Sequence, residues 1–138
     1  MIIGIDPGTK TGLAVSEGGK ITAVYTLKMY QALALVADYH KRMGDELSVI
    51  FEDARQRRWL EKEKSVSEYR GKLMGAGSVK RDCVIWEEFL EGNGIHYHAQ
   101  APTKGATKWS EEQFRRITGY QGRTSNHGRD AALLVLGR

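Results

Sequence analysis

Cysteine, proline and long apolar runs are scarce in this sequence of 138 residues. The one cysteine, Cys83, excludes an internal disulfide framework and fits a reducing compartment. No apolar run approaches the length that crosses a membrane, and residues 2–5 are too few to form the core of a signal peptide. We therefore expect a cytoplasmic protein without a membrane partner. Because the first predicted strand starts next to Met1, we also expect no segment before the fold.

The composition is that of a globular protein, with 41% hydrophobic and 28% charged residues. A chain of 138 residues is long enough for a substantial core, and we expect residues 1–138 to form one domain. Lysine and arginine, 21 in all, outnumber the 17 acidic residues, which gives a net charge of +4 and a pI near 9.2. This excess of positive charge favours polyanionic partners.

The first dozen residues predict a buried strand that ends in a carboxylate. Residues 2–5 include three isoleucines, Asp6 follows directly, and Pro7-Gly8 then makes a tight turn. An acid at the end of a buried strand is poorly hydrated and needs a metal ion or hydrogen-bond donors nearby. Residues 11–15 and 21–27 predict two further strands, joined by a Gly-Gly pair that is typical of a hairpin. The chain therefore opens as an antiparallel meander.

A helix and a fourth strand follow, and this strand also ends in acids. Apolar residues recur at helical spacing over 30–43, whereas 47–51 is a strand that leads into Glu52 and Asp53. A strand–helix–strand crossover after a meander implies a mixed sheet. Because side chains alternate between the faces of a sheet, only one of the two acids shares a face with Asp6. We favour Glu52, and expect Asp53 to cap the following loop or to pair with an arginine.

The stretch from 54 to 72 is rich in positive charge and has no clear periodicity. It is either a solvated charged loop or a nucleic-acid contact, in which cations bind phosphates and aromatic rings stack on bases. On the second interpretation, the candidate DNA-binding residues are Arg55, Arg57, Arg58, Trp59, Lys62, Lys64, Arg70 and Lys72.

The next part of the chain predicts a long helix, a fifth strand and a well-capped helix. The long helix begins near residue 71 or 78 and ends at about 90, and the strand spans 95–99. A wide apolar arc runs along the long helix, which therefore either packs wholly onto the chain's own sheet or also meets a second surface. The stripe at the centre of that arc is Val79, Cys83, Trp86 and Leu90. Ser110 opens the following helix with a capping box.

The last predicted helix, 126–136, places His127 and Asp130 on one face of its first turn. Its apolar C-terminal part indicates burial against the sheet, and its positive end favours an anion. We therefore expect Asp6, Glu52 and Asp130 to converge beside His127. Converging acids repel one another unless a metal neutralises them, and oxygen-rich ligation suits Mg²⁺ or, with a histidine present, Mn²⁺. Two such ions about 4 Å apart hold the attacking and leaving oxygens of a phosphodiester displacement.

The ordered combination of these motifs resembles the RuvC family of Holliday junction resolvases, of either bacterial or phage type. The motifs are Ile-Gly-Ile-Asp-Pro-Gly-Thr at 3–9, an acid that closes the fourth strand, and His-x-x-Asp on the last helix. The resemblance covers essentially the whole chain. It implies an α/β, RNase H-like fold: a five-stranded mixed sheet, made of a three-stranded antiparallel meander plus parallel strands, flanked by helices. It also implies metal-dependent cleavage of four-way junctions or other branched DNA.

The resemblance assigns roles to individual residues as well. The implied catalytic residues are Asp6, Glu52, His127, Asp130, Lys104 and Lys108, of which the first four would bind the metal ions. The two lysines flank a turn that resembles the family's Gly-x-Ala-x-Lys segment and would contact the scissile phosphate. Where many members have a fourth aspartate this chain has His127, so the choice between Mg²⁺ and Mn²⁺ stays open. Arginines also occupy the place of an aromatic wedge found in many members, and the nearest aromatic residue is Trp59.

Resolving a four-way junction needs paired nicks, so we expect a homodimer with two-fold symmetry. The family resemblance points to the long helix, and to the stripe Val79, Cys83, Trp86 and Leu90, as its interface. It also implies a nucleoid-associated protein in a bacterial cell or a phage-infected host.

Two other interpretations compete with a nuclease. Asp6-Pro7-Gly8-Thr9 followed by Gly12 also resembles the phosphate loop of actin-like and sugar-kinase ATPases, but those enzymes close two lobes around a nucleotide and this chain has room for one. The other is a catalytically inactive RNase H-like module that only binds nucleic acid. Such a module has no need of three acids at the ends of buried elements.

Overall fold

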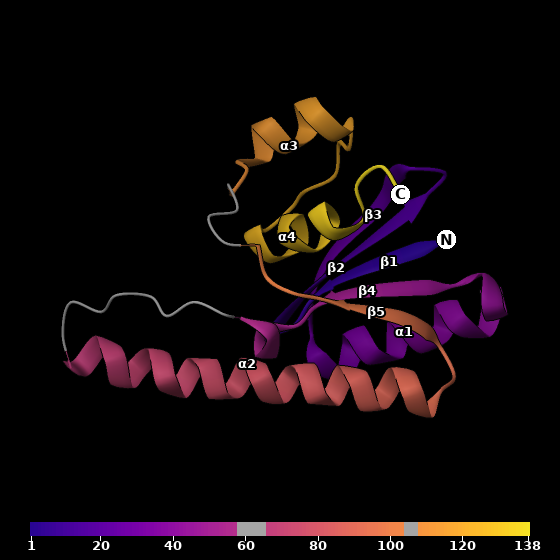
Figure 1. The fold of residues 1–138 in the computed structure, drawn as a ribbon. Coiled ribbons are helices and arrows are strands. Elements are labelled where there is room, and N and C mark those ends of the chain that lie inside the picture. Colours follow the sequence, from indigo (N-terminus) through magenta and orange to yellow (C-terminus); the bar gives the residue numbers. More distant parts are fainter. Residues whose placement is uncertain (58–65, 104–107) are drawn as a thin grey trace.

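The computed structural model describes residues 1–57, 66–103 and 108–138, and for residues 66–70, 72 and 73 it describes the backbone alone. The described residues form a five-stranded mixed sheet with strand order β3-β2-β1-β4-β5 (Figure 1). The strands are β1 (Ile2–Asp6), β2 (Lys10–Glu17), β3 (Lys20–Lys28), β4 (Ser48–Glu52) and β5 (His96–Gln100). The first three are antiparallel, whereas β4 runs parallel to both β1 and β5. The predicted RNase H-like arrangement of a meander plus parallel strands is confirmed.

Helices cover both faces of this sheet. The helices are α1 (Met29–Met43), α2 (Val66–Gly92), α3 (Glu111–Thr118) and α4 (Asn126–Val135), with short 3₁₀ turns η1 (Gly44–Glu46) and η2 (Ala54–Gln56). Figure 1 shows α1 and α2 on one face, and α4 with α3 beyond it on the other. In the described part of the chain, no helix is both long enough and apolar enough to cross a membrane.

The helix α2 begins at Val66, earlier than the sequence predicted. Its N-terminal half extends past the edge of the sheet (Figure 1), and Gly71 and residues 74–78 are exposed. A segment with no surface to cover needs no apolar stripe, so it lacks the periodicity by which helices are recognised. Glycines at 71, 75 and 77 are weak helix formers, so the segment is extended from the anchored C-terminal half of the helix.

The two faces of the sheet carry separate apolar cores. One lies between the sheet and α1 and α2 and contains Phe51, Trp86 and Leu90, all fully buried. The other lies between the sheet and α4, where Phe114 from α3 joins Val135. Each core is built from alternate residues of the same strands, which fixes which side chains face which helices.

The predicted dimer stripe belongs to the first of these cores. Cys83, Trp86 and Leu90 have no exposed surface, and Val79 is half-buried against the same cluster. The prediction that this stripe meets a second copy is therefore wrong. The apolar arc of α2 is wide because Phe89, on the same helix, also packs against this core, with its ring edge-on to Trp86. For this stripe, the alternative prediction that the arc packs onto the chain's own sheet is confirmed.

Glycines allow α4 to approach the sheet closely at the end where β1 stops. A β-carbon on Gly12 would collide with the backbone carbonyl of His127, and one on Gly4 with that of Ala131. On the helix, a β-carbon at Gly128 would lie 2.6 Å from a methyl group of Val24. The absence of side chains on both surfaces brings the first turn of α4 directly over the ends of β1 and β2. Ser125 caps that turn by accepting a hydrogen bond from the Gly128 amide.

Candidate active site

Two acids meet at one end of the sheet because β1 and β4 are parallel neighbours. Ile5 pairs with Phe51, so that Asp6 and Glu52 stand side by side at the ends of their strands. Ile5 and Phe51 face the α2 side, and alternation therefore directs both acids to the opposite face, toward α4. The sequence prediction that Glu52, and not Asp53, shares the face of Asp6 agrees with this register.

The first turn of α4 adds His127 and Asp130 to the same cleft. His127 Nδ1 lies 2.9 Å from Asp6 Oδ2 and joins the helix to the end of β1 by a hydrogen bond. Asp130 lies 3.8 Å, through its Oδ2, from Lys108 Nζ. The cleft is thus lined by three acids and a histidine, with Lys108 and Arg57 among its cationic residues.

Asp6 and Glu52 hold their protons more tightly than isolated carboxyl groups. Burial raises the pKa of Asp6, an effect that the Asp130 carboxylate adds to and His127 opposes. Burial also raises the pKa of Glu52, and there the negative charges of Asp6 and Asp130 reinforce it. Arg57 and Lys108 oppose the rise at Glu52. Burial is the largest cause at both groups, and the charges of neighbouring acids add to it.

The donor set fits a hard divalent cation in type and in charge, since three carboxylates supply oxygen ligands and the histidine a nitrogen. As the side chains stand, no three His, Cys, Asp or Glu residues within 1–57, 66–103 and 108–138 are arranged to hold a metal ion. Coordination would require the carboxylates to turn toward a shared point. Burial, together with the charges of neighbouring acids, raises the pKa values of Asp6 and Glu52 and opposes this until a cation is present.

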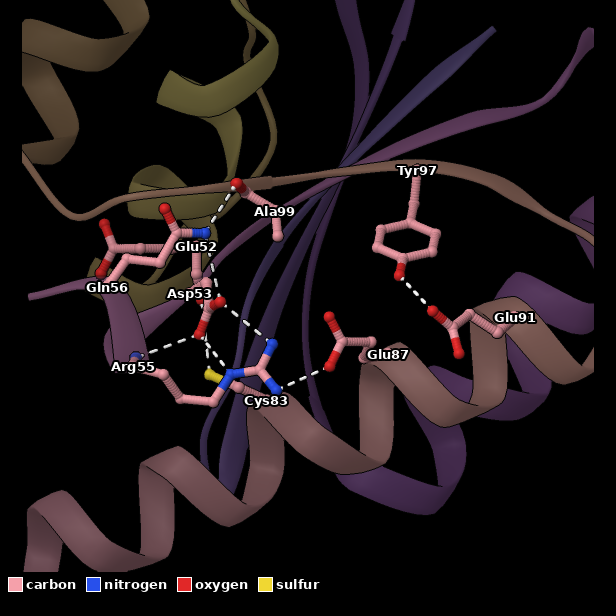
Figure 2. A network of polar contacts seen from close by, with 9 residues as sticks. All are labelled: Glu52, Asp53, Arg55, Gln56, Cys83, Glu87, Glu91, Tyr97 and Ala99. Atoms are coloured by element: carbon pink, nitrogen blue, oxygen red, sulfur yellow. Dashed lines mark hydrogen bonds and ion pairs between the residues drawn. The ribbon is translucent and has the colours of Figure 1, made fainter.

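The residue after Glu52 has the opposite environment. Asp53 is almost fully buried on the α2 side and accepts hydrogen bonds from the Arg55 amide and guanidinium and from Gln56 (Figure 2). Burial tends to raise the pKa of Asp53, but the bonds from Arg55 and Gln56 outweigh it and hold that pKa below its usual value. The prediction that Asp53 caps the loop or pairs with an arginine is confirmed in both respects.

Arg55 is committed to this cluster and does not face the cleft. Its Nε and Nη2 donate to the two oxygens of Asp53 at 2.7 and 3.0 Å, and its Nη1 donates to Glu87 Oε2 on α2 at 2.6 Å. Figure 2 shows the guanidinium held between the two carboxylates. The prediction that Arg55 binds DNA is therefore wrong, because its donors already satisfy two acids within the protein.

The same cluster fixes the backbone at Glu52. The Cys83 thiol donates to the Glu52 carbonyl at 3.6 Å, and the Asp53 amide donates to the Gln100 carbonyl at 2.8 Å. Gln56 Nε2 reaches the Ala99 carbonyl at 3.0 Å and so ties the turn after β4 to β5. Burial raises the pKa of the Cys83 thiol to about 11, which keeps it protonated and able to donate. Glu52 thus projects into the cleft from a backbone that is held on its other side.

Sequence reasoning missed Arg129, which is buried in α4 directly before Asp130. Its Nε donates to the Trp109 carbonyl at 2.8 Å, and its Nη1 donates to Thr124 Oγ1 at 2.9 Å. The bond to Trp109 holds the residue next to Lys108 and thereby sets where that lysine meets the cleft. Arg129 stands among the polar residues that open α4, so the sequence carried no signal that it would be buried.

The structure describes only some of the other residues predicted to contact DNA. Arg57 is exposed and lines the cleft. Arg70 and Lys72 lie in α2, where only the backbone is described. Outside the described residues lie Arg58, Trp59, Lys62, Lys64 and Lys104.

Comparison with known proteins identifies the fold through structure alone. No family model matches the chain, and no curated protein matches its sequence. Among solved structures, the chain has the fold of the RuvC-type resolvases, which are RNase H-like. T. thermophilus RuvC, in complex with a Holliday junction substrate, is similar with a TM-score of 0.52 and 18% sequence identity, over 99% of this chain and 90% of that one. The fowlpox virus resolvase, in complex with its substrate Holliday junction DNA, has a TM-score of 0.46 at 15% identity, over 99% and 98%.

Proposed function

We propose that this protein is a divalent-metal-dependent endonuclease that cleaves branched DNA, with four-way junctions as its main substrate. The observation that carries the proposal is the meeting of Asp6, Glu52 and Asp130 in one cleft at the end of the sheet. A protein that only bound nucleic acid would gain nothing from Asp6 and Glu52, whose pKa values are raised by burial and by neighbouring acids. The fold shared with RuvC, which is bound to a Holliday junction in its structure, supports the choice of substrate.

The residues of the cleft divide the work of phosphodiester hydrolysis. Two Mg²⁺ or Mn²⁺ ions, when bound, would polarise the phosphate and lower the pKa of the attacking water. Asp6, Glu52, Asp130 and His127 would hold these ions, and in their absence His127 orients Asp6 through a hydrogen bond. Lys108, beside Asp130, would contact the scissile phosphate, and the family resemblance gives Lys104 the same role.

Binding to the DNA backbone would come from the basic stretch that follows β4. Arg57, at the start of this stretch, lines the cleft. Phosphate contacts and base stacking are the proposed roles of Arg57, Arg58, Trp59, Lys62, Lys64, Arg70 and Lys72. Arg55 is left out of this set because it is bound to Asp53 and Glu87.

A homodimer would supply the second of the two nicks. With the stripe around Trp86 buried, the contact would use the outward side of α2, where Met74 is 80% and Val84 38% exposed. Sedimentation of the protein, free and on junction DNA, measures this directly. A monomer in both states would contradict it.

The experiment that tests the proposal compares labelled four-way, three-way, flap and linear duplex DNA at matched concentration, with Mg²⁺, Mn²⁺ or EDTA. We expect nicks in branched DNA with either metal, most strongly in the four-way junction, and none with EDTA. Binding without nicks in any substrate would favour the inactive module, and ATP hydrolysis without DNA cleavage would favour the kinase-like alternative.

A further inference from the structure

We propose that Lys10 and Lys28 form a phosphate-binding pair that holds the DNA strand next to the acidic cleft, on the β3 side. This inference rests on the proposed function and deepens it, because neither lysine is among the contacts named so far. It follows from the position of the two lysines along the sheet, from the face they share, and from the repulsion between them.

Charged residues stand in a row across the end of the sheet. In strand order they are Lys28 at the end of β3, Lys10 at the start of β2, Asp6 at the end of β1 and Glu52 at the end of β4. Asp6 lies opposite Gly12, two residues from Lys10, so with strands about 4.8 Å apart and about 3.4 Å per residue the Cα atoms of Lys28 and Asp6 lie roughly 12 Å apart. At about 3.4 Å of rise per nucleotide, one DNA strand passes about three phosphates over that distance. A strand whose scissile phosphate lies at the acids would therefore meet both lysines.

Both lysines lie on the face of the sheet that carries the acids. Lys10 pairs with Lys28, and two residues along β2, Gly12 pairs with Thr26. Gly12 lies under the backbone of His127, and the Thr26 hydroxyl is hydrogen-bonded to Ser125 at the cap of α4. Alternation thus places Lys10 and Lys28 on the α4 face as well. Lys10 lines the cleft itself, and both lysines are exposed.

The pair is unfavourable for the protein alone. Like charges directly opposite each other on antiparallel strands destabilise the pairing. Among the ion pairs of the described residues, none includes either lysine. Lys28 also precedes the first turn of α1, which contains no acidic residue, so that a positive helix end adds to the repulsion. A phosphate placed between the lysines would offset their repulsion, pair with both charges and counter the positive end of α1.

The other end of the same two strands serves as an internal contrast. There Glu17 lies directly opposite Lys20, a pairing of opposite charges. Lys20 is exposed like Lys10 and Lys28, but it lies at the edge of the sheet away from the acids. The hairpin therefore carries a stabilising pair where no ligand is proposed and a repulsive pair beside the cleft.

The test measures binding of a synthetic four-way junction against salt concentration, without divalent metal, for Lys10→Gln, Lys28→Gln, the double variant and the control Lys20→Gln. Each neutralised phosphate contact should reduce the slope of log affinity against log salt by about 0.9, and weaken binding several-fold at low salt. The unfolding temperature of the free protein should stay unchanged or rise for the cleft variants. Lys20→Gln should leave binding unchanged and should not raise the unfolding temperature.

The charge reversal Lys28→Glu sharpens the result, because it places a glutamate opposite Lys10. It should raise the unfolding temperature of the free protein while weakening junction binding further than Lys28→Gln. If the wild type binds and cleaves junctions, but the glutamine variants keep its affinity and salt slope, the lysine pair is wrong and the proposed function stands. If the wild type binds no branched DNA at low salt, the proposed function fails, and this inference with it.

Discussion

Glu52 and Asp53 are adjacent in the chain and differ in almost every physical respect. Glu52 faces α4 and two other acids, and burial and those charges raise its pKa. Asp53 faces α2, accepts hydrogen bonds from Arg55 and Gln56, and has a lowered pKa. The protein thus disfavours the ionised form of Glu52 and stabilises the ionised form of its neighbour, Asp53.

The contrast separates two uses of a carboxylate. Asp53 connects the turn after β4 to α2 through Arg55 and Glu87, and its bonds are complete without any ligand. Asp6 and Glu52 instead stand where burial and neighbouring acids disfavour their ionised forms, which a bound cation would stabilise. Substitutions should therefore affect stability at Asp53 and cleavage at the acids of the cleft.

The largest effect is expected from the acids of the cleft. Asp6→Asn, Glu52→Gln and Asp130→Asn should each reduce cleavage by more than about 100-fold, because each removes a proposed metal ligand. Junction binding should persist, since phosphate contacts do not depend on these groups. Cleavage rates and binding affinities measured in parallel decide this.

Asp53→Asn is the matched control for Glu52→Gln at the neighbouring position. At a temperature where the variant is folded, it should cleave far better than Glu52→Gln. Equal losses from the two substitutions would erase the distinction between the two acids.

His127 is expected to have the next largest effect, because it gives Asp6 the hydrogen bond that the other cleft acids lack in the described residues. His127→Ala should reduce cleavage by roughly 10- to 100-fold. His127→Asp should retain activity and shift the preference toward Mg²⁺, since it replaces a nitrogen donor with oxygen. Rates in Mg²⁺ and in Mn²⁺ measure both outcomes, and an unchanged rate for His127→Ala in both metals would reduce His127 to a helix-start residue.

Arg55→Met should affect stability more than chemistry. Removing the guanidinium leaves the buried Asp53 without its main donors, and we expect the free energy of unfolding to fall by about 2 kcal/mol. Arg115→Met, which breaks the exposed pair with Glu111, should cost less than about 1 kcal/mol. Denaturant titration of both variants gives the comparison, and equal losses would mean that the Asp53 cluster contributes no more than a surface ion pair.

The smallest effect concerns the dependence of stability on pH. In the metal-free protein Asp6 and Glu52 bind protons more tightly when folded, so their contribution to the free energy of unfolding falls as pH rises from 3.8 and 4.5 through their raised pKa values. Asp53 acts in the opposite direction: its contribution is present above 3.8 and is lost as pH falls through its lowered pKa.

Glu52→Gln should therefore become more stable relative to the wild type as pH rises through this range, by up to about 1 kcal/mol. Added Mg²⁺ should reduce the difference, because it favours the ionised form of Glu52. Denaturant titrations at several pH values, with and without Mg²⁺, measure both effects. A difference that does not vary with pH would show that Glu52 is not under electrostatic stress.

The sequence was sufficient to predict the sheet and the convergence of the acids, because those features have local signals. Apolar runs that stop at Asp6 and Glu52, and the i, i+3 spacing of His127 and Asp130, are visible without any tertiary knowledge. The fate of Arg55 was not visible, since its second partner, Glu87, lies 32 residues away on another element. The burial of Trp86 was ambiguous for a similar reason: an apolar arc shows that a helix is covered, but does not show by what.

The close contact between α4 and the sheet at Gly12 makes the spacing of the active site adjustable. Asp6 and Glu52 belong to the sheet and His127 and Asp130 to the helix, so the distance between the two sets depends on how deeply the helix sits. Gly12→Ala would add a methyl group that collides with the backbone of His127. This would push α4 away from the sheet and carry both His127 and Asp130 with it. The size of the residue at position 12 therefore sets the distance between the acids on the sheet and the two residues on α4. A substitution there would change the separation of the proposed metal ions without altering any of their ligands.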